Sequence, residues 1–264
     1  MPTDAPAPRF DPASAFRLDG RTAIVTGASA GLGRRFARVL HGAGATVVVA
    51  ARRGGALEDL AAELGDRVVA VPTDVADPAS CQHLVETAVD VGGGSLDVLV
   101  NNAGISWIGP AEQEPPEEWE RTLAVNLTGP FRLCQLAFEP MVASGGGAIV
   151  NVSSMLGLVA GTPVKQAGYC ASKGGLVNLT RELGAQWARK GVRVNGIAPG
   201  WFHSEMTEVM WGDDASEAYV RRGAPIGREG AEHELDGALL FLASDASSYV
   251  VGHTIPVDGG WTAV

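Results

Sequence analysis

The 264-residue sequence has little cysteine and no long apolar run. Its three cysteines are far apart and form no Cys-x-x-Cys or Cys/His metal-ligand spacing, and the five histidines show no ligand spacing either. We therefore expect a reduced, cytoplasmic setting with no disulfide framework and no catalytic metal. No apolar stretch reaches the ~18 residues that cross a membrane, so we expect no membrane association.

Positive charge is also scarce. Lys and Arg number 20 against 30 Asp and Glu, giving a formal net charge of −10. A general nucleic-acid-binding protein needs basic residues to neutralise phosphates, so this class is excluded. A small anionic ligand is not excluded, because a local basic site can lie in an acidic protein.

Glycine, by contrast, is abundant. The 35 glycines are about twice the usual ~7% share, which favours tight turns and backbone that approaches a ligand closely. The length suffices for one domain with its own core. Residues 1–15 are rich in Pro and Ala and lack the apolar region of a secretory signal, so we predict a flexible tail there. Residues 16–264 are predicted to form a single domain.

Apolar runs alternate with helical patterns along this domain. Strands are predicted at 22–26, 46–51, 68–71, 96–100, 148–152, 192–197 and 254–257. Helices are predicted at 32–41, 56–64, 78–89, 116–142, 167–189 and 232–242, and an irregular segment at 201–230. Continuous β-branched runs indicate strands that are buried on both faces. The pattern predicts an α/β fold, a doubly wound parallel sheet of about seven strands in which ligands bind at the carboxyl ends.

A glycine-rich turn follows the first predicted strand. Gly27, Gly31 and Gly33 lie in a G-x-x-x-G-x-G spacing, with Ser29 and Leu32 between them, directly before a predicted helix. Such a turn lets a pyrophosphate approach the backbone, and the helix N-terminus offers unpaired N–H groups. An ordinary strand–helix turn is the alternative, but the position at the first such junction favours dinucleotide binding.

Tyr169 and Lys173 are four residues apart on a predicted helix and therefore share a face. A nearby ammonium is expected to lower the pKa of the phenol, so that the tyrosine exchanges a proton with a carbonyl or alcohol oxygen near neutral pH. The alternative is a chance pair on a solvated helix. The sequence has only three Tyr and three Lys, which makes chance a poor explanation.

Together these features resemble the short-chain dehydrogenase/reductase family, over about residues 18–257. The resemblance rests on several motifs in order: the turn just described, Asp74-Val75, NNAG at 101–104, Asn126, Ser154, Tyr169-x-x-x-Lys173 and Pro199-Gly200. It implies hydride transfer between a nicotinamide cofactor and a ketone or secondary alcohol, and a homotetramer.

The resemblance also implies roles for individual residues. Ser154 would hydrogen-bond the reacting oxygen, with the adjacent Ser153 as a competitor. Asn126 would kink its helix and hold a water that connects Lys173 to solvent. Tyr169 would be the proton donor and acceptor, and Lys173 would tune it and bind the ribose. The further cofactor contacts are Asp74 and Val75 at the adenine, Asn102, Ala103 and Gly104 beside the ribose, and Pro199, Gly200 and Thr207 near the nicotinamide.

The end of the second predicted strand indicates which cofactor is preferred. An acidic residue there would favour NAD(H), but the sequence has Ala51 followed by Arg52 and Arg53. Guanidinium groups suit a 2′-phosphate, so NADP(H) is predicted, with NAD(H) as the alternative. Ala30 occupies a position that is basic in many relatives that use NADP(H), which counts against this prediction.

Large apolar residues gather where the substrate is expected. We predict a substrate lid at about 201–222 and a pocket that includes Trp107, Leu156, Trp201 and Phe202; Met155, Met206, Met210 and Trp211 are further candidates. The alternative is that half of these side chains belong to the core or to a subunit contact. Three other functions stay open: a 3-oxoacyl-(acyl-carrier-protein) reductase, a non-catalytic cofactor-binding regulator, and an epimerase or dehydratase that retains its cofactor.

Overall fold

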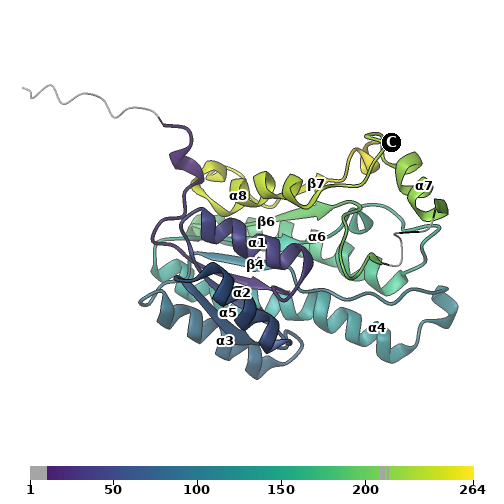
Figure 1. The fold of residues 1–264 in the computed structure, drawn as a ribbon. Coiled ribbons are helices and arrows are strands. Elements are labelled where there is room, and N and C mark those ends of the chain that lie inside the picture. Colours follow the sequence, from purple (N-terminus) through teal and green to yellow (C-terminus); the bar gives the residue numbers. More distant parts are fainter. Residues whose placement is uncertain (1–10, 209–211, 213) are drawn as a thin grey trace, which may run out of the picture.

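Seven parallel strands form one sheet in the order β3-β2-β1-β4-β5-β6-β7 (Figure 1). The computed structural model describes residues 11–208, 212 and 214–264. The strands are β1 (Thr22–Thr26), β2 (Thr46–Ala51), β3 (Val68–Pro72), β4 (Val98–Asn101), β5 (Gly147–Val152), β6 (Val192–Pro199) and β7 (Thr254–Val257). The predicted fold is confirmed: a single Rossmann-like domain with a seven-stranded parallel sheet.

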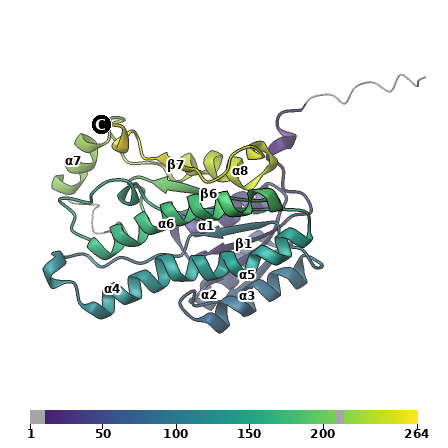
Figure 2. The same ribbon diagram turned by 180° about the vertical axis from the view of Figure 1, so that it is seen from behind.

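Helices cover both faces of this sheet (Figures 1 and 2). One face packs against α1 (Gly31–Gly42), α2 (Gly54–Leu64) and α8 (Asp236–Ala243). The other packs against α3 (Pro78–Val91), α5 (Gly129–Ala143) and α6 (Ala167–Trp187). None of the helices in the described ranges is long and apolar enough to cross a membrane.

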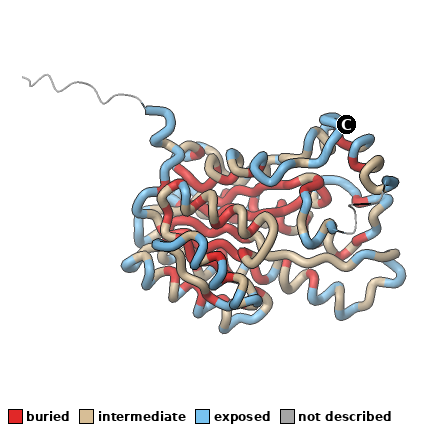
Figure 3. Tube along the Cα trace, in the orientation of Figure 1, coloured by how far each residue is buried: buried red, intermediate tan, exposed pale blue. Residues whose placement is uncertain are grey.

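The strands are buried on both sides because their side chains pack alternately into two separate cores. In β1, Ala23 and Val25 contact the core beneath α1, whereas Ile24 points to the core beneath α3 and α5. All three side chains are 0% exposed. Figure 3 shows this burial as continuous red along the central strands. A continuous apolar run, rather than an alternating one, is what such a doubly covered strand requires.

The direction of chain progression through the sheet reverses at β1. From β1 the chain continues to β2 and β3 on one side, and then returns to place β4 on the other side. Loops at the carboxyl ends of β1 and β4 consequently diverge, and ligands bind at this point in open α/β sheets. The fold therefore places the glycine-rich turn and the NNAG segment next to each other.

One local prediction was wrong, and the structure refines a second. The segment 201–230, predicted to be irregular, contains α7 (Asp214–Gly223). This helix has few apolar residues, so its helical pattern in the sequence is weak. Its first turn carries acidic residues and its last turn carries Arg221 and Arg222, an arrangement that the helix dipole favours. The helix predicted at 116–142 is divided: α4 (Pro116–Leu123) joins α5 through a π-helical turn, η3 (Ala124–Thr128).

The N-terminal residues are described only in part. A short 3-10 turn, η1 (Ser14–Phe16), precedes β1, and the remainder of the predicted tail at 1–10 lies outside the described residues. Met210 and Trp211 of the predicted lid also lie outside them. Within the described ranges no group of three or more His, Cys, Asp or Glu is arranged to hold a metal ion.

Candidate active site

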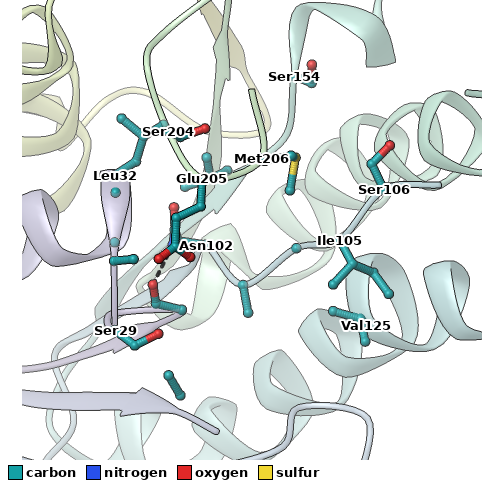
Figure 4. A pocket seen from close by; sticks show the side chains of 18 of the residues that line it. Ser29, Leu32, Asn102, Ile105, Ser106, Val125, Ser154, Ser204, Glu205 and Met206 are labelled. Atoms are coloured by element: carbon teal, nitrogen blue, oxygen red, sulfur yellow. Dashed lines mark hydrogen bonds between the residues drawn. The ribbon is translucent and has the colours of Figure 1, made fainter. Parts of the chain in front are cut away.

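A cavity of about 720 Å³ opens at the carboxyl ends of the strands. Figure 4 shows Ser29 and Leu32 on one side of it, Ile105, Ser106 and Ser154 on the other, and Glu205 and Met206 between them in that view. Its size is typical of a small-molecule site. The predicted residues that line it are Gly27, Ser29, Gly31, Leu32, Gly33, Arg52, Arg53, Asp74, Val75, Asn102, Ala103, Gly104, Ser154, Tyr169, Lys173, Pro199, Gly200, Phe202 and Thr207.

The glycine-rich turn forms one wall by bringing backbone close to backbone. Gly27 has φ +69°, and a Cβ there would lie 2.8 Å from Nδ2 of Asn102. A Cβ on Gly33 would overlap the carbonyl oxygen of Gly27. Ala30 caps α1 without a side-chain hydrogen bond, so the amides of the first helical turn are open to an anion. This cradle fits the pyrophosphate of a dinucleotide.

Thr26 and Asn102 lock the turn to the NNAG segment. The Thr26 hydroxyl accepts hydrogen bonds from the backbone amides of Asn102 (3.0 Å) and Ala103 (3.1 Å). Nδ2 of Asn102 donates in return to the carbonyl oxygen of Thr26 at 2.9 Å. Thr26 is 1% exposed, so its hydroxyl is shielded from water, and the three partly buried bonds hold the two segments of the cavity wall together.

Tyr169 and Lys173 lie on α6 and both reach the cavity. Nζ of Lys173 donates to the carbonyl oxygen of Val152, at the end of β5, at 2.8 Å. The same ammonium lies 5.7 Å from the centroid of the Tyr169 ring. Lys173 is only 3% exposed, and burial lowers its pKa to about 8. The ammonium is therefore still the major form at neutral pH.

The pKa of Tyr169 shifts in the direction opposite to the prediction. Burial raises it, and a hydrogen bond with Ser154 opposes that rise only in part. The predicted lowering is therefore wrong for this arrangement, because loss of water around the buried phenol is the largest influence on its pKa. The phenol is consequently held protonated at neutral pH, which is the form that donates a proton.

The two serines after β5 have different partners. Ser153 donates its hydroxyl to the carbonyl oxygen of Lys173 at 2.9 Å and so joins β5 to α6. The Ser154 hydroxyl instead accepts a hydrogen bond from the Leu156 amide at 3.1 Å, at the start of the short helix η4 (Met155–Gly157). Its own proton is left to donate toward Tyr169 or toward an oxygen in the cavity. This difference favours Ser154 over Ser153 as the group that orients a substrate.

Asn126 occupies the π-helical turn and is 0% exposed. Its side chain pairs with the backbone of Ile105 in both directions, donating to the carbonyl and accepting from the amide, each at 2.9 Å. Nδ2 also donates to the Ser172 hydroxyl at 3.0 Å. A Cβ on Gly104 would lie within 3.6 Å of both Lys173 Nζ and Asn126 Oδ1, so Gly104 separates the two groups. Asn126 therefore anchors the cavity wall beside Lys173 without lining it.

Three of the four predicted pocket residues do not line the cavity. Leu156 and Trp201 are 5% and 8% exposed and belong to a small core with Val220 of α7. Trp201 also makes edge contacts with the rings of Tyr219 (6.1 Å) and Trp261 (5.9 Å). Only Phe202 of the four lines the cavity, and Trp107 lies outside its lining. Trp201 thus attaches the lid helix to the body of the protein.

Sequence reasoning missed several lining residues. Ser204 and Glu205 precede Thr207, whose hydroxyl donates to the carbonyl of Phe202 at 2.7 Å and accepts from the Ser204 amide at 3.0 Å. This turn directs the segment after β6 across the cavity. The signal was available, because both residues fall between the predicted cofactor contacts Gly200 and Thr207. The others that were missed are Thr73, Ile105, Ser106, Ile108, Val125 and Val152.

The two arginines after β2 differ. Arg53 forms a two-point ion pair with Glu205, with N–O distances of 2.9 Å for both contacts, and donates to the Ser29 hydroxyl at 3.1 and 3.2 Å. This pairing raises the pKa of Arg53 and lowers that of Glu205. Arg52 is exposed and makes no ion pair with any residue in the described ranges. The cavity mouth therefore carries one paired and one unpaired guanidinium.

Known proteins resemble this chain over nearly its full length. The family model described as enoyl-(acyl carrier protein) reductase matches residues 27–262. D-threitol dehydrogenase of Mycolicibacterium smegmatis is 40% identical over 94% of this chain and 95% of its own. Galactitol 2-dehydrogenase (L-tagatose-forming) of Cereibacter sphaeroides is 40% identical over 96% of this chain and 99% of its own.

Solved structures agree with these relatives. A gluconate 5-dehydrogenase from Burkholderia cenocepacia, in complex with NADP and tartrate, superposes with a TM-score of 0.91 at 37% identity, covering 96% of this chain and 100% of its own. A short-chain type dehydrogenase/reductase from Mycobacterium marinum gives a TM-score of 0.91 at 35% identity, covering 96% and 100%. The cradle, the Ser-Tyr-Lys arrangement and these similarities lead to one conclusion: the chain belongs to the short-chain dehydrogenase/reductase family of oxidoreductases.

Proposed function

We propose that this protein transfers a hydride between NADP(H) and a small molecule that carries a ketone or secondary alcohol. One observation carries the proposal: Ser154, Tyr169 and Lys173 line the same cavity as the glycine-rich cradle. A bound nicotinamide supplies the hydride in reduction and accepts it in oxidation. The protein contributes the proton, the orientation and the charge.

Tyr169 is the proposed proton donor to the carbonyl oxygen. Its raised pKa keeps the phenol protonated until it is used, and the Ser154 hydroxyl is free to hold the same oxygen. When the phenolate forms, the Lys173 ammonium is close enough to stabilise it. In the oxidative direction, the phenolate form of Tyr169 would take the proton of the alcohol. Asn126 is proposed to hold the hydrogen-bonded connection from Lys173 to solvent.

The preference for NADP(H) is proposed from the mouth of the cavity. No carboxylate stands at Ala51 to bind a 2′-hydroxyl, and Arg52 and Arg53 line the cavity directly after it. Guanidinium groups match phosphate oxygens in geometry as well as charge. Several similar solved structures contain NADP. NAD(H) remains the alternative.

For the substrate we propose a polyol or the corresponding keto sugar. The two dehydrogenases named above act on sugar alcohols by name, and the Ser106 and Ser154 side chains that line the cavity suit a polar substrate. A 3-oxoacyl thioester is the second candidate, because the family model carries an acyl-carrier-protein description. We further propose a cytoplasmic homotetramer, and light scattering that gave a mass near 27.3 kDa would contradict that assembly.

The test is a cofactor assay with purified protein. NADPH and NADH are offered in parallel with keto sugars, simple ketones and 3-oxoacyl thioesters, and NADP⁺ and NAD⁺ with polyols. We expect the fastest turnover with a polyol or keto-sugar pair and the phosphorylated cofactor. Turnover of the thioester alone would select the second candidate. Bound cofactor without turnover of any compound would contradict the proposed reaction.

A further inference from the structure

Glu205 lies where the proposed cofactor would meet Arg53. Both oxygens of its carboxylate accept from the guanidinium, and Ser29 accepts from the same side chain. All three nitrogen atoms of the guanidinium therefore already donate hydrogen bonds. A 2′-phosphate requires these same donors, because two-point binding is how a guanidinium recognises phosphate oxygens.

The position of the pair also matters. Arg53 follows β2 and Glu205 follows β6, and β1, β4 and β5 lie between those two strands in the sheet. The ion pair therefore joins opposite sides of the cavity mouth. Figure 4 shows Glu205 reaching toward the side of the cavity that carries Ser29. Nothing comparable involves Arg52, which has no ion-pair partner among the residues that the structure describes.

We propose that Glu205 is a specificity-determining residue for the cofactor, because it competes with the 2′-phosphate of NADP(H) for the guanidinium of Arg53. The proposal rests on the proposed function. A cofactor with a free 2′-hydroxyl does not have to displace the carboxylate, whereas a 2′-phosphate must displace it and then remain near its negative charge. Glu205 thus weakens the binding of NADP(H) selectively, and Arg52 supplies the charge that is not contested.

The pair is open to water, with side chains 54% and 67% exposed. Exposed ion pairs are weak and are screened by salt, so the competition is modest and depends on ionic strength. Removing the carboxylate should tighten NADPH binding by about two- to fivefold, the range that such pairs give. NADH binding should change less than NADPH binding.

The experiment measures dissociation constants by cofactor fluorescence, without turnover. Wild type, Glu205→Gln, Arg53→Gln and the double variant are titrated with NADPH and NADH at low and at high salt. Glu208→Gln is the matched control, since its side chain lies on the same segment and is also 67% exposed. We expect Glu205→Gln to shift the ratio of the two constants toward NADPH, the shift to shrink at high salt, and Glu208→Gln to leave the ratio unchanged.

In the Arg53→Gln background, Glu205→Gln should have no effect, because the contested group is missing. An unchanged ratio in Glu205→Gln, or a shift toward NADH, overturns the inference while the proposed function stands. The inference holds whichever cofactor the wild type prefers, since it concerns the change in the ratio. If the wild type binds neither cofactor, the proposed function fails and takes the inference with it.

Discussion

The cradle, formed by residues 26–33 and 101–104, and the described part of the lid predicted at 201–222 are held differently. Both contribute residues to the same cavity. In the cradle, Thr26 and Asn102 exchange partly buried hydrogen bonds, and glycines bring backbone against backbone. In the lid, exposed ion pairs join Arg53 to Glu205 and Arg221 to Glu217. Buried bonds fix geometry, whereas exposed ones are weak and adaptable. The difference agrees with the proposed function, in which the cradle holds the pyrophosphate and the lid segment adapts to the groups that bind beside it.

The largest effect is expected for Tyr169, the proposed catalytic residue beside the cradle, when it is compared with a tyrosine of the lid. Tyr169→Phe removes the transferable proton and should lower kcat by roughly 10²- to 10⁴-fold, the usual contribution of general acid catalysis. Tyr219→Phe is the matched control in the lid, because it loses only a hydrogen bond to the Thr162 carbonyl at 3.2 Å. Steady-state kinetics check both. Comparable losses in the two variants would refute the assignment of Tyr169.

The second largest effect is expected from a substitution that disrupts the packing of the cradle. Gly33→Ala places a methyl group against the carbonyl of Gly27, and backbone cannot move aside as a flexible side chain does. We expect the free energy of unfolding to fall by about 3 kcal/mol, the upper part of the range for overpacking. Gly42→Ala in the same helix meets nothing within 4 Å and should instead stabilise the protein by about 0.5–1 kcal/mol. Denaturant unfolding distinguishes the two, and equal effects would contradict the close packing.

A third prediction concerns pH. The pKa of Lys173 is about 8 in the folded protein against an ordinary value of 10.5, so the unfolded chain binds more protons between these values. Stability from this group therefore rises with pH across that window. Relative to Lys173→Met, wild type should gain about 2 kcal/mol between pH 7.5 and pH 10. A difference between the two proteins that stays constant with pH would show that Lys173 is not held at a lowered pKa.

The smallest effect is expected in the lid. Arg221→Ala removes an exposed pair with Glu217 one helical turn away, 3.2 Å long. Such pairs contribute about 0.3–0.5 kcal/mol, so thermal unfolding should shift by no more than a degree or two. A loss above ~1 kcal/mol would mean that α7 depends on its surface charges, and the contrast between lid and cradle would weaken.

The cradle was predictable from sequence because its constraints are local. A glycine that needs a positive φ or an absent Cβ is visible in the sequence itself, and the five residues predicted for the turn all line the cavity. Asn126 could be singled out because asparagine is a poor residue inside a helix, and it lies in the π-helical turn. Likewise, continuous apolar runs indicated which strands have helices on both faces.

The lid and the protonation behaviour were less predictable. Sequence does not say which way a large apolar side chain points. Trp201 and Leu156 were therefore predicted to line a pocket, although they pack against α7. The shift of Tyr169 depends on how much water the fold removes, which a four-residue spacing does not contain. The pair of Arg53 and Glu205 joins residues 152 positions apart, beyond any local pattern.

The scarcity of lysine has a practical consequence for chemical labelling. Lys173 is buried, so amine-reactive reagents should acylate the exposed lysines, Lys165 and Lys190. Lys165 lies just before α6, on the side of the cavity. Lys190 precedes β6 and therefore lies at the amino ends of the strands, opposite the cavity. Replacing Lys165 with arginine would leave Lys190 as the accessible lysine side chain. The protein could then be tethered to a solid support through Lys190, at the amino ends of the strands, with the cavity facing the solution.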